Sequence, residues 1–505
     1  MLGPSGQDGV RTADVVAALS LASDLGMEVP LENGLRGTLM AMRLCDVLGT
    51  GRDTAVQAFY SSLLFYVGCT ANAMIGSEVF ADGDAFPRYA TTSRYGSRLD
   101  QLGGMARAVA PPGSSPVLRA MRATHGLYRL ARAFPEIVAA DCDAARMLTA
   151  RLGLPAAVSD LFAHADDRWD RMGEDIPLPM RIAQVACDAA IQQAFGGDEV
   201  AAQVVRSRAG GAFDPDVAEH VDKILEIDPN TSVWAETLAS EPRPHLVLES
   251  DAIDLAVSAI GDFADLASPY LVGHSAGVAA LAADAGRRCG LGAGEVVALR
   301  RAALVHDVGR VAVPVRVWQH AGPLSPDDWE RVRLHAYHTE RVLTRSPFLA
   351  SLAPIAAFHH ERLDGSGYHR GTSVLGMPGR LLAAADAYHA MTEPRPHRAA
   401  MSQAQAADTV CEQVRAGRLD PDAVGAVLAA AGHRAPHIER PAGLTARETE
   451  VVGLLARGMQ TKQVARVLRI SVKTADHHIQ NAYRKIGVST RAGAALFAMQ
   501  HGLVE

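Results

Sequence analysis

Seven histidine and aspartate residues in the second half of this 505-residue chain have the types and the order of a metal-binding set. Four of them form the adjacent pairs His306-Asp307 and His359-His360. Imidazole suits borderline divalent ions, and a carboxylate can bridge two ions. An adjacent His-Asp pair projects two ligands from one turn, so the histidine can bind one ion while the aspartate bridges to a second. The candidate metal ligands are His274, His306, Asp307, His335, His359, His360 and Asp386.

The sequence around these residues resembles the HD superfamily of metal-dependent phosphohydrolases. The segments HDVGR (306–310), HHERLDGSGYH (359–369) and RLLAAADAY (380–388) are similar to motifs of its HD-GYP subfamily, whose members hydrolyse cyclic di-GMP. The resemblance covers residues 251–436 and implies two divalent transition-metal ions, of Fe, Mn, Zn or Ni. One ion would be bound by His274, His306, Asp307 and Asp386, and the other by Asp307, His335, His359 and His360.

The resemblance also implies a reaction. A metal-bound hydroxide would attack a phosphodiester in line, with no covalent intermediate. Asp307 and Arg310 would be the catalytic residues. Gly365, Gly367 and Tyr368 would form a substrate loop, because glycine lets a phosphate or a base approach the backbone closely.

Three positions depart from the subfamily pattern. His369 stands in place of the proline of the GYP motif, Arg310 replaces the usual lysine, and Tyr270 replaces a glutamate found in members that bind three ions. Two ions are therefore expected rather than three. Arg310 keeps a positive charge that can bind phosphate, although it cannot donate a proton at neutral pH.

The C-terminal residues have the start signals of four short helices. Thr445 with Glu448 predicts a capping box, Thr461 opens the next helix, and Ser471 is expected to N-cap the third. A turn at residues 469–471 then gives a helix-turn-helix arrangement. Residues 441–505 carry nine Lys/Arg against four acids, a net charge of +5. Since the whole chain has a net charge of −7, the first 440 residues have a net charge of −12. The basic domain is the part expected to meet a polyanion.

Residues 444–498 resemble the LuxR-type DNA-binding domain throughout. The resemblance implies that the third helix reads double-stranded DNA, and a dimer is expected because one small helical unit reads a half-site. Asp476 stands where the family usually has lysine, which removes a phosphate contact or accepts from a cytosine amino group. Candidate DNA-binding residues are Lys462, Lys473, Thr474, His477, His478, Asn481, Arg484 and Lys485, with Arg491 also available to phosphates.

The first half of the chain looks like a duplicate of the HD-like region. Residues 164–173 are similar to 359–368, and GAFDPDV (211–217) is similar to GRLDPDA (417–423). The metal ligands are replaced, by Asn33, Phe65, Tyr66, Ala165, Asp166 and Cys187, so this copy cannot bind the same metals. It is either a structural partner of the second copy, which we favour, or a sensory domain with a ligand in the vacated pocket.

Helical periodicity recurs nearly everywhere and alternating patterns are scarce, so an all-α chain is expected. The expected segments are a flexible N-terminus (1–10), a degenerate HD-like domain (11–227), a linker (228–250), the HD-GYP-like domain (251–436), a linker (437–443) and the LuxR-type domain (444–505). Six scattered cysteines form no CxxC pair, and no run reaches the ~18 apolar residues that span a bilayer. A cytoplasmic protein is expected.

Together these features predict a transcriptional regulator that carries a dinuclear phosphodiesterase domain. The substrate would be a nucleotide or another phosphoester, for example a cyclic dinucleotide such as cyclic di-GMP. In the alternative, the HD-like domain is weakly active or inactive and acts as a ligand sensor that controls DNA binding.

Overall fold

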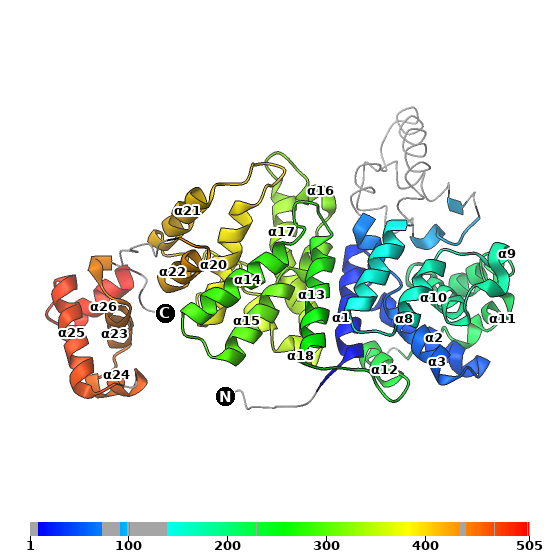
Figure 1. The fold of residues 1–505 in the computed structure, drawn as a ribbon, viewed down its shortest axis with the longest axis horizontal. Coiled ribbons are helices and arrows are strands. Elements are labelled where there is room, and N and C mark those ends of the chain that lie inside the picture. Colours follow the sequence, from blue (N-terminus) through cyan, green and yellow to red (C-terminus); the bar gives the residue numbers. More distant parts are fainter. Residues whose placement is uncertain are drawn as a thin grey trace. The chain divides into compact units, whose positions relative to one another are not determined.

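The computed structural model describes residues 9–72, 91–97, 100–101, 139–228, 230–433, 441–468, 470–501 and 503. Their regular secondary structure is almost entirely helical, which confirms the expected all-α class (Figure 1). The one sheet in this part of the chain has two short antiparallel strands, β1 (Val10–Arg11) and β2 (Val247–Leu248), with Val10 opposite Leu248. No described helix is long and apolar enough to cross a bilayer.

The described chain divides into two compact units. The first contains residues 1–276, 304–353 and 395–397. Its helices, with η marking 3₁₀ turns, are α1 (Thr12–Gly26), α2 (Asn33–Leu48), α3 (Arg52–Leu63), η1 (Val67–Asn72), α8 (Ala156–Leu161), η2 (Phe162–His164), α9 (Trp169–Met172), η3 (Gly173–Asp175), α10 (Leu178–Arg208), α11 (Pro215–Ala218), η4 (Val221–Lys223), α12 (Val233–Ala239), α13 (Ser250–Asp265), η5 (Val308–Ala312), α16 (Val315–Trp318), α17 (Pro326–Leu343) and α18 (Pro347–Ala350).

The second unit contains residues 277–303, 354–394 and 398–505. Three helices have residues in both units, α14 (His274–Arg288), α15 (Ala293–Val305) and α19 (Ala353–Ala356). The remaining elements are α20 (Met377–Thr392), α21 (Gln403–Arg415), α22 (Pro421–Ala430), η6 (Pro441–Gly443), α23 (Ala446–Ala456), α24 (Thr461–Val467), α25 (Val472–Ile486) and α26 (Arg491–Gln500).

Helix α1 is the centre of the first unit. All of its residues from Thr12 to Asp24 are buried except Asp14, which is half-buried. Burial on every face is typical of a helix in the core of a protein. It packs against α2 and α3 of the N-terminal segment and also against η5, α17 and α18. Because η5 directly follows His306-Asp307, a helix from the first copy supports the backbone beside two candidate metal ligands.

The same contacts recur at matching positions of the two similar segments. The Asp24 carboxylate accepts from the Gly34 amide, and Asp265 accepts from the Ser275 amide, each ten residues on. The Trp169 amide donates to the Ala212 carbonyl at 3.0 Å, as Leu363 does to Arg418 at 3.1 Å. The ion pair Arg181–Asp214 has its counterpart in Arg380–Asp420. These recurring contacts support the proposal that one segment is a duplicate of the other.

Residues 228–250, expected to be a linker, contain packed structure. Ser232 caps α12, and the Thr237 hydroxyl donates to the Leu35 carbonyl of α2. The Pro and charged residues that suggested a linker lie beside a helix of only seven residues, which is too short to show periodicity. Residues 1–8, most of the expected 437–443 linker and most of residues 73–138 lie outside the described residues.

Candidate metal centre and nucleic-acid interface

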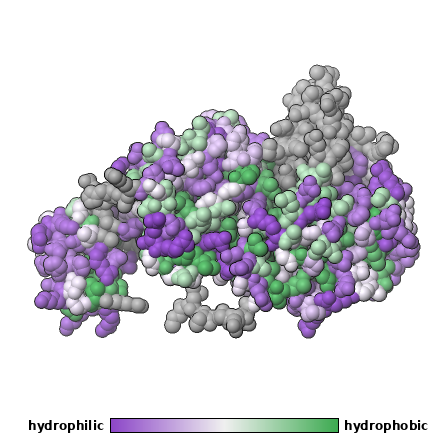
Figure 2. Space-filling view, in the orientation of Figure 1, coloured by the Kyte–Doolittle hydropathy of each residue, from purple (hydrophilic) through white to green (hydrophobic). Residues whose placement is uncertain are grey.

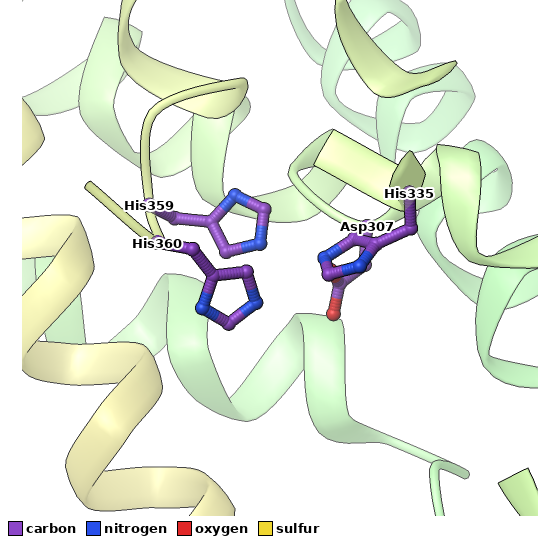
Figure 3. A group of neighbouring side chains, drawn as sticks. All are labelled: Asp307, His335, His359 and His360. Carbon is purple, nitrogen blue, oxygen red and sulfur yellow. The ribbon is translucent and has the colours of Figure 1, made fainter. Parts of the chain in front are cut away.

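The structure brings the seven candidate ligands into two groups. Ligand atoms of Asp307, His335, His359 and His360 all lie within 4.8 Å of one another, and those of His274, His306 and Asp386 do likewise. In Figure 3 the rings of the adjacent pair His359-His360 face Asp307 and His335. Three imidazoles and a carboxylate at this spacing suit a transition-metal ion.

Asp307 has the geometry of a bridging ligand. One of its oxygens, Oδ2, lies 3.0 Å from His306 Nε2 and 3.6 Å from His274 Nε2, both in the second group. The other oxygen, Oδ1, lies 3.5 Å from His335 Nε2 in the first group. All four side chains are buried. Each oxygen of one carboxylate thus faces a different set of imidazoles.

Backbone carbonyls orient two of the histidines. Nδ1 of His335 contacts the Val332 carbonyl, and Nδ1 of His359 lies 2.7 Å from the Ala356 carbonyl. A proton held on Nδ1 by a carbonyl leaves Nε2 free of a proton, which is the form that binds a metal. The donor set and the carbonyls that orient it therefore fit divalent ions.

The expected substrate loop is tightly folded next to His360. Gly365 has a φ of 75°, and a Cβ atom at Gly367 would lie 2.4 Å from the Glu361 Cα atom, so both positions require glycine. The Tyr368 ring stacks on the His360 ring with centroids 4.7 Å apart. The buried Glu361 carboxylate accepts from two loop amides and fixes the loop's path.

The Arg310 side chain points at the Asp307 carboxylate. Its Nε lies 2.7 Å from Asp307 Oδ2, and the side chain is 9% exposed. The guanidinium carbon lies 5.4 Å from the centroid of the Trp318 ring, and the indole N–H donates to the Arg310 carbonyl. The arginine thus places a permanent positive charge beside the candidate metal ligands.

Two residues that the sequence reasoning missed also approach the ligand set. Ligand atoms of His389, on α20, and of Glu393, the residue that follows this helix, lie within 4.8 Å of each other and of His274. A Cβ atom at Gly277 would lie 2.0 Å from His389 Nε2, so glycine makes room for this imidazole. Helical spacing is the sequence signal that could have identified them. His389 follows Asp386 by three residues and Glu393 follows His389 by four, and residues at these separations lie on one face of a helix.

The first copy fills the equivalent place with other side chains. Asn33 is buried, and the Tyr66 hydroxyl donates to the Cys187 carbonyl at 3.1 Å. The Arg94 guanidinium lies 5.0 Å from the Phe65 ring centroid and pairs with Asp166 at 2.7 Å. The sequence positions that we align with the metal ligands thus include the aromatic residues Phe65 and Tyr66, beside a cation paired with Asp166.

The C-terminal helices have the expected caps. Thr445 and Glu448 form the capping box of α23, and the Ser471 hydroxyl accepts from the Thr474 amide at the start of α25. Ala475, Ile479 and Ala482 face the core of the domain. Val472, the first residue of α25, is 46% exposed.

Most candidate DNA-binding side chains lie on the outer face of α25. His477, Asn481 and Arg484 form a hydrogen-bonded row along it. Hydrophilic side chains cover most of the face of α25 seen in Figure 2. Lys462, Lys473, Thr474, Asp476, His477 and Arg484 are exposed, whereas His478 and Asn481 are half-buried.

The Lys485 side chain contacts two groups of its own domain. Its Nζ lies 2.6 Å from the Glu448 carboxylate and 3.0 Å from the Gly443 carbonyl. Burial raises the pKa of Glu448, but the hydrogen bonds from Lys485 and Thr445 outweigh burial and lower it. The lysine joins α25 to the N-terminus of α23, so we do not propose it as a DNA contact.

Comparison with known proteins agrees with this division of the chain. Residues 259–423 match the family model described as HD domain, and residues 442–498 match that of bacterial regulatory proteins of the luxR family. The 3'3'-cGAMP-specific phosphodiesterase 3 of Vibrio cholerae is 28% identical over 82% of this chain and 93% of its own length. A cyclic di-GMP phosphodiesterase of Thermotoga maritima is 39% identical over 20% of this chain and 29% of its own length.

A solved structure extends the similarity to the fold. The crystal structure of a cyclic GMP-AMP-specific phosphodiesterase of V. cholerae superposes with a TM-score of 0.57 and 25% identity, covering 85% of this chain and 99% of the other. This coverage exceeds the stretch matched by the HD model, so the similarity includes most of the N-terminal segment as well. The chain therefore contains an HD domain, homologous to HD-GYP phosphodiesterases, and a C-terminal domain of the luxR family.

Proposed function

We propose that this protein is a metal-dependent phosphodiesterase that cleaves a cyclic dinucleotide and binds double-stranded DNA through its C-terminal domain. The observation that carries the proposal is the grouping of Asp307, His335, His359 and His360, whose ligand atoms lie within 4.8 Å of one another. The relatives that act on 3'3'-cGAMP and on cyclic di-GMP support the substrate class. The 3'3'-cGAMP enzyme matches over far more of the chain, so we place that substrate first.

The candidate centre assigns a role to each group of residues. Two divalent ions would lower the pKa of a bound water and neutralise charge at phosphorus. The two histidine groups and Asp386 would hold the ions, and Asp307 would bridge them through its two oxygens. Arg310 binds a phosphate oxygen, since its charge persists at any physiological pH. The loop containing Gly365, Gly367 and Tyr368 would contact the substrate.

The C-terminal domain would place the outer face of α25 in the major groove. Lys473, Thr474, His477, His478 and Asn481 would approach base edges, while Lys462, Arg484 and Arg491 would bind phosphates. A homodimer would allow two half-sites to be read. Leu496 and Met499 of α26 are 55% and 70% exposed and offer apolar surface for such pairing.

The proposal is tested on the full-length protein. Metal content is measured after purification, and 3'3'-cGAMP, cyclic di-GMP and cyclic di-AMP are each incubated with wild type and with the His359→Ala/His360→Ala variant. We expect about two ions per chain and hydrolysis of 3'3'-cGAMP by wild type. In the variant we expect loss of the hydrolysis and of about one ion per chain. A metal-loaded protein that cleaves none of the three, yet changes its DNA affinity when one of them binds, would instead be a ligand sensor.

A further inference from the structure

One buried hydroxyl connects the two segments that carry three of the proposed metal ligands. Thr339 lies on α17, one turn after His335, and is fully buried. Its Oγ1 donates to the His306 carbonyl at 2.9 Å and accepts from the Gly309 amide at 3.0 Å. The hydroxyl thus closes a hydrogen-bonded link across the His306-Asp307 turn from the neighbouring helix.

The backbones on either side of this link are in direct contact. A Cβ atom at Gly309 would lie 2.1 Å from the His335 carbonyl oxygen and 2.4 Å from the Thr339 amide nitrogen. Glycine at 309 therefore lets the turn approach α17, and Thr339 fixes its position there. The bound groups are buried, so removing the hydroxyl leaves a carbonyl and an amide without that partner in a place screened from water.

The ligands on the two sides are close enough for a small displacement to matter. Asp307 Oδ1 on the turn lies 3.5 Å from His335 Nε2 on α17. A transition-metal site tolerates errors of only about 0.2 Å in its ligand distances. Neither His306 nor His335 can keep its place relative to the other if the turn shifts along α17.

We infer that Thr339 is a positioning residue that sets the spacing between the His306-Asp307 turn and His335, and thereby the metal affinity of the centre. The inference rests on the proposed metal centre and not on the identity of the substrate. Thr339 contacts ligand backbones and does not itself bind an ion. Removing a group that orients metal ligands typically weakens metal binding or activity about 10–100-fold.

The test compares Thr339→Val, which keeps the side-chain shape but removes the hydroxyl, with Thr339→Ser, which keeps the hydroxyl. Mn²⁺ affinity of the full-length chain is measured by competition with a chelator. We expect about 10–100-fold weaker binding for Thr339→Val and recovery toward the wild-type value for Thr339→Ser. The matched control is Thr344→Val, on the exposed C-terminal end of α17, where the hydroxyl bonds only the carbonyls of its own helix.

Folding is checked by circular dichroism, and Thr339→Ala is used in place of the valine variant if the latter is unfolded. Wild-type Mn²⁺ affinity in a folded hydroxyl-free variant would overturn the inference, as would equal weakening in the serine variant. A wild-type protein that binds Mn²⁺ but hydrolyses no cyclic dinucleotide refutes the proposed activity and leaves this inference intact. A wild-type protein that binds no Mn²⁺ refutes both.

Discussion

At the scale of single residues, Arg310 and Trp318 form a pair whose geometry bears on the proposed chemistry. The indole also lies beside a metal ligand, because its ring centroid is 6.2 Å from that of His335. An arginine side chain has many rotamers, and contact with an aromatic face favours the few that keep the guanidinium over the ring. Trp318 therefore holds the guanidinium beside Asp307, where a phosphate oxygen of the substrate would also lie.

Replacing Trp318 with leucine is expected to lower kcat/KM for the cyclic dinucleotide about 2–30-fold, corresponding to the ~0.5–2 kcal/mol of a partly desolvated cation–π contact. Trp318→Phe keeps a ring and should retain part of this activity. Steady-state kinetics on metal-loaded protein measure the effect. The control is Trp329→Leu, a change at a half-exposed tryptophan of α17. Equal losses in Trp318→Leu and the control would refute a role through Arg310.

A second residue-scale prediction concerns the first copy. Arg94 and Asp166 form an ion pair with side chains 18% and 29% exposed, and the guanidinium covers the Phe65 ring. Arg94→Met leaves Asp166 without this cation and should lower the free energy of unfolding by about 1–3 kcal/mol. Urea denaturation measures the change. A double variant that also carries Asp166→Asn should be less destabilised than Arg94→Met if the lost charge pairing is the cause.

At the scale of elements, the C-terminal domain depends on a contact between the ends of two helices. Local capping starts α23 and α25, but the Lys485–Glu448 ion pair fixes how α25 meets α23. The carboxylate belongs to the capping box, so one side chain serves both the start of its own helix and the position of the proposed recognition helix.

Lys485→Met is expected to destabilise this domain by about 1–2 kcal/mol, since a charge-assisted hydrogen bond is lost at a partly exposed site. The lowered pKa of Glu448 means that its stabilising effect is present above the ordinary value of 4.5 and is lost as the pH falls through the lower value in the folded protein. Wild type should therefore lose protection in α23 and α25 below about pH 4.5, and Lys485→Met should show less of this dependence. Hydrogen exchange of peptides from both helices, corrected for intrinsic rates, measures it.

At the scale of the whole molecule, the N-terminal copy and the HD motif share structural support. Helix α1 packs on η5 and α17, and further links within the same unit are the ion pairs Arg151–Asp262 and Arg345–Glu32. These contacts favour a structural partner over an independent sensor. The packed Phe65, Tyr66 and Cys187 in the place of the metal ligands point the same way.

A charge placed in α1 should therefore damage the metal centre from almost 300 residues away in sequence. Ala18 is fully buried, so Ala18→Asp is expected to lower the free energy of unfolding by about 2–5 kcal/mol and to reduce bound metal. The control is Met147→Asp, a change at a side chain that is 69% exposed. Metal content and thermal unfolding of the full-length chain measure both. Full metal content in a destabilised Ala18→Asp protein would show that the metal centre does not depend on support from α1.

The sequence by itself determined the features that depend on residue type and short spacing. The helical periodicity, the capping boxes and the order of histidines and aspartates are all local, and each predicted its element or ligand type. Tertiary structure alone decided which ligand atoms meet. It gave Asp307 two differently facing oxygens, brought His389 and Glu393 to His274, placed Arg94 on Phe65 and paired Lys485 with Glu448. Apart from the adjacent pair His306 and Asp307, these contacts join residues that are from 28 (Asp307 and His335) to 119 (His274 and Glu393) positions apart, and no local pattern encodes such packing.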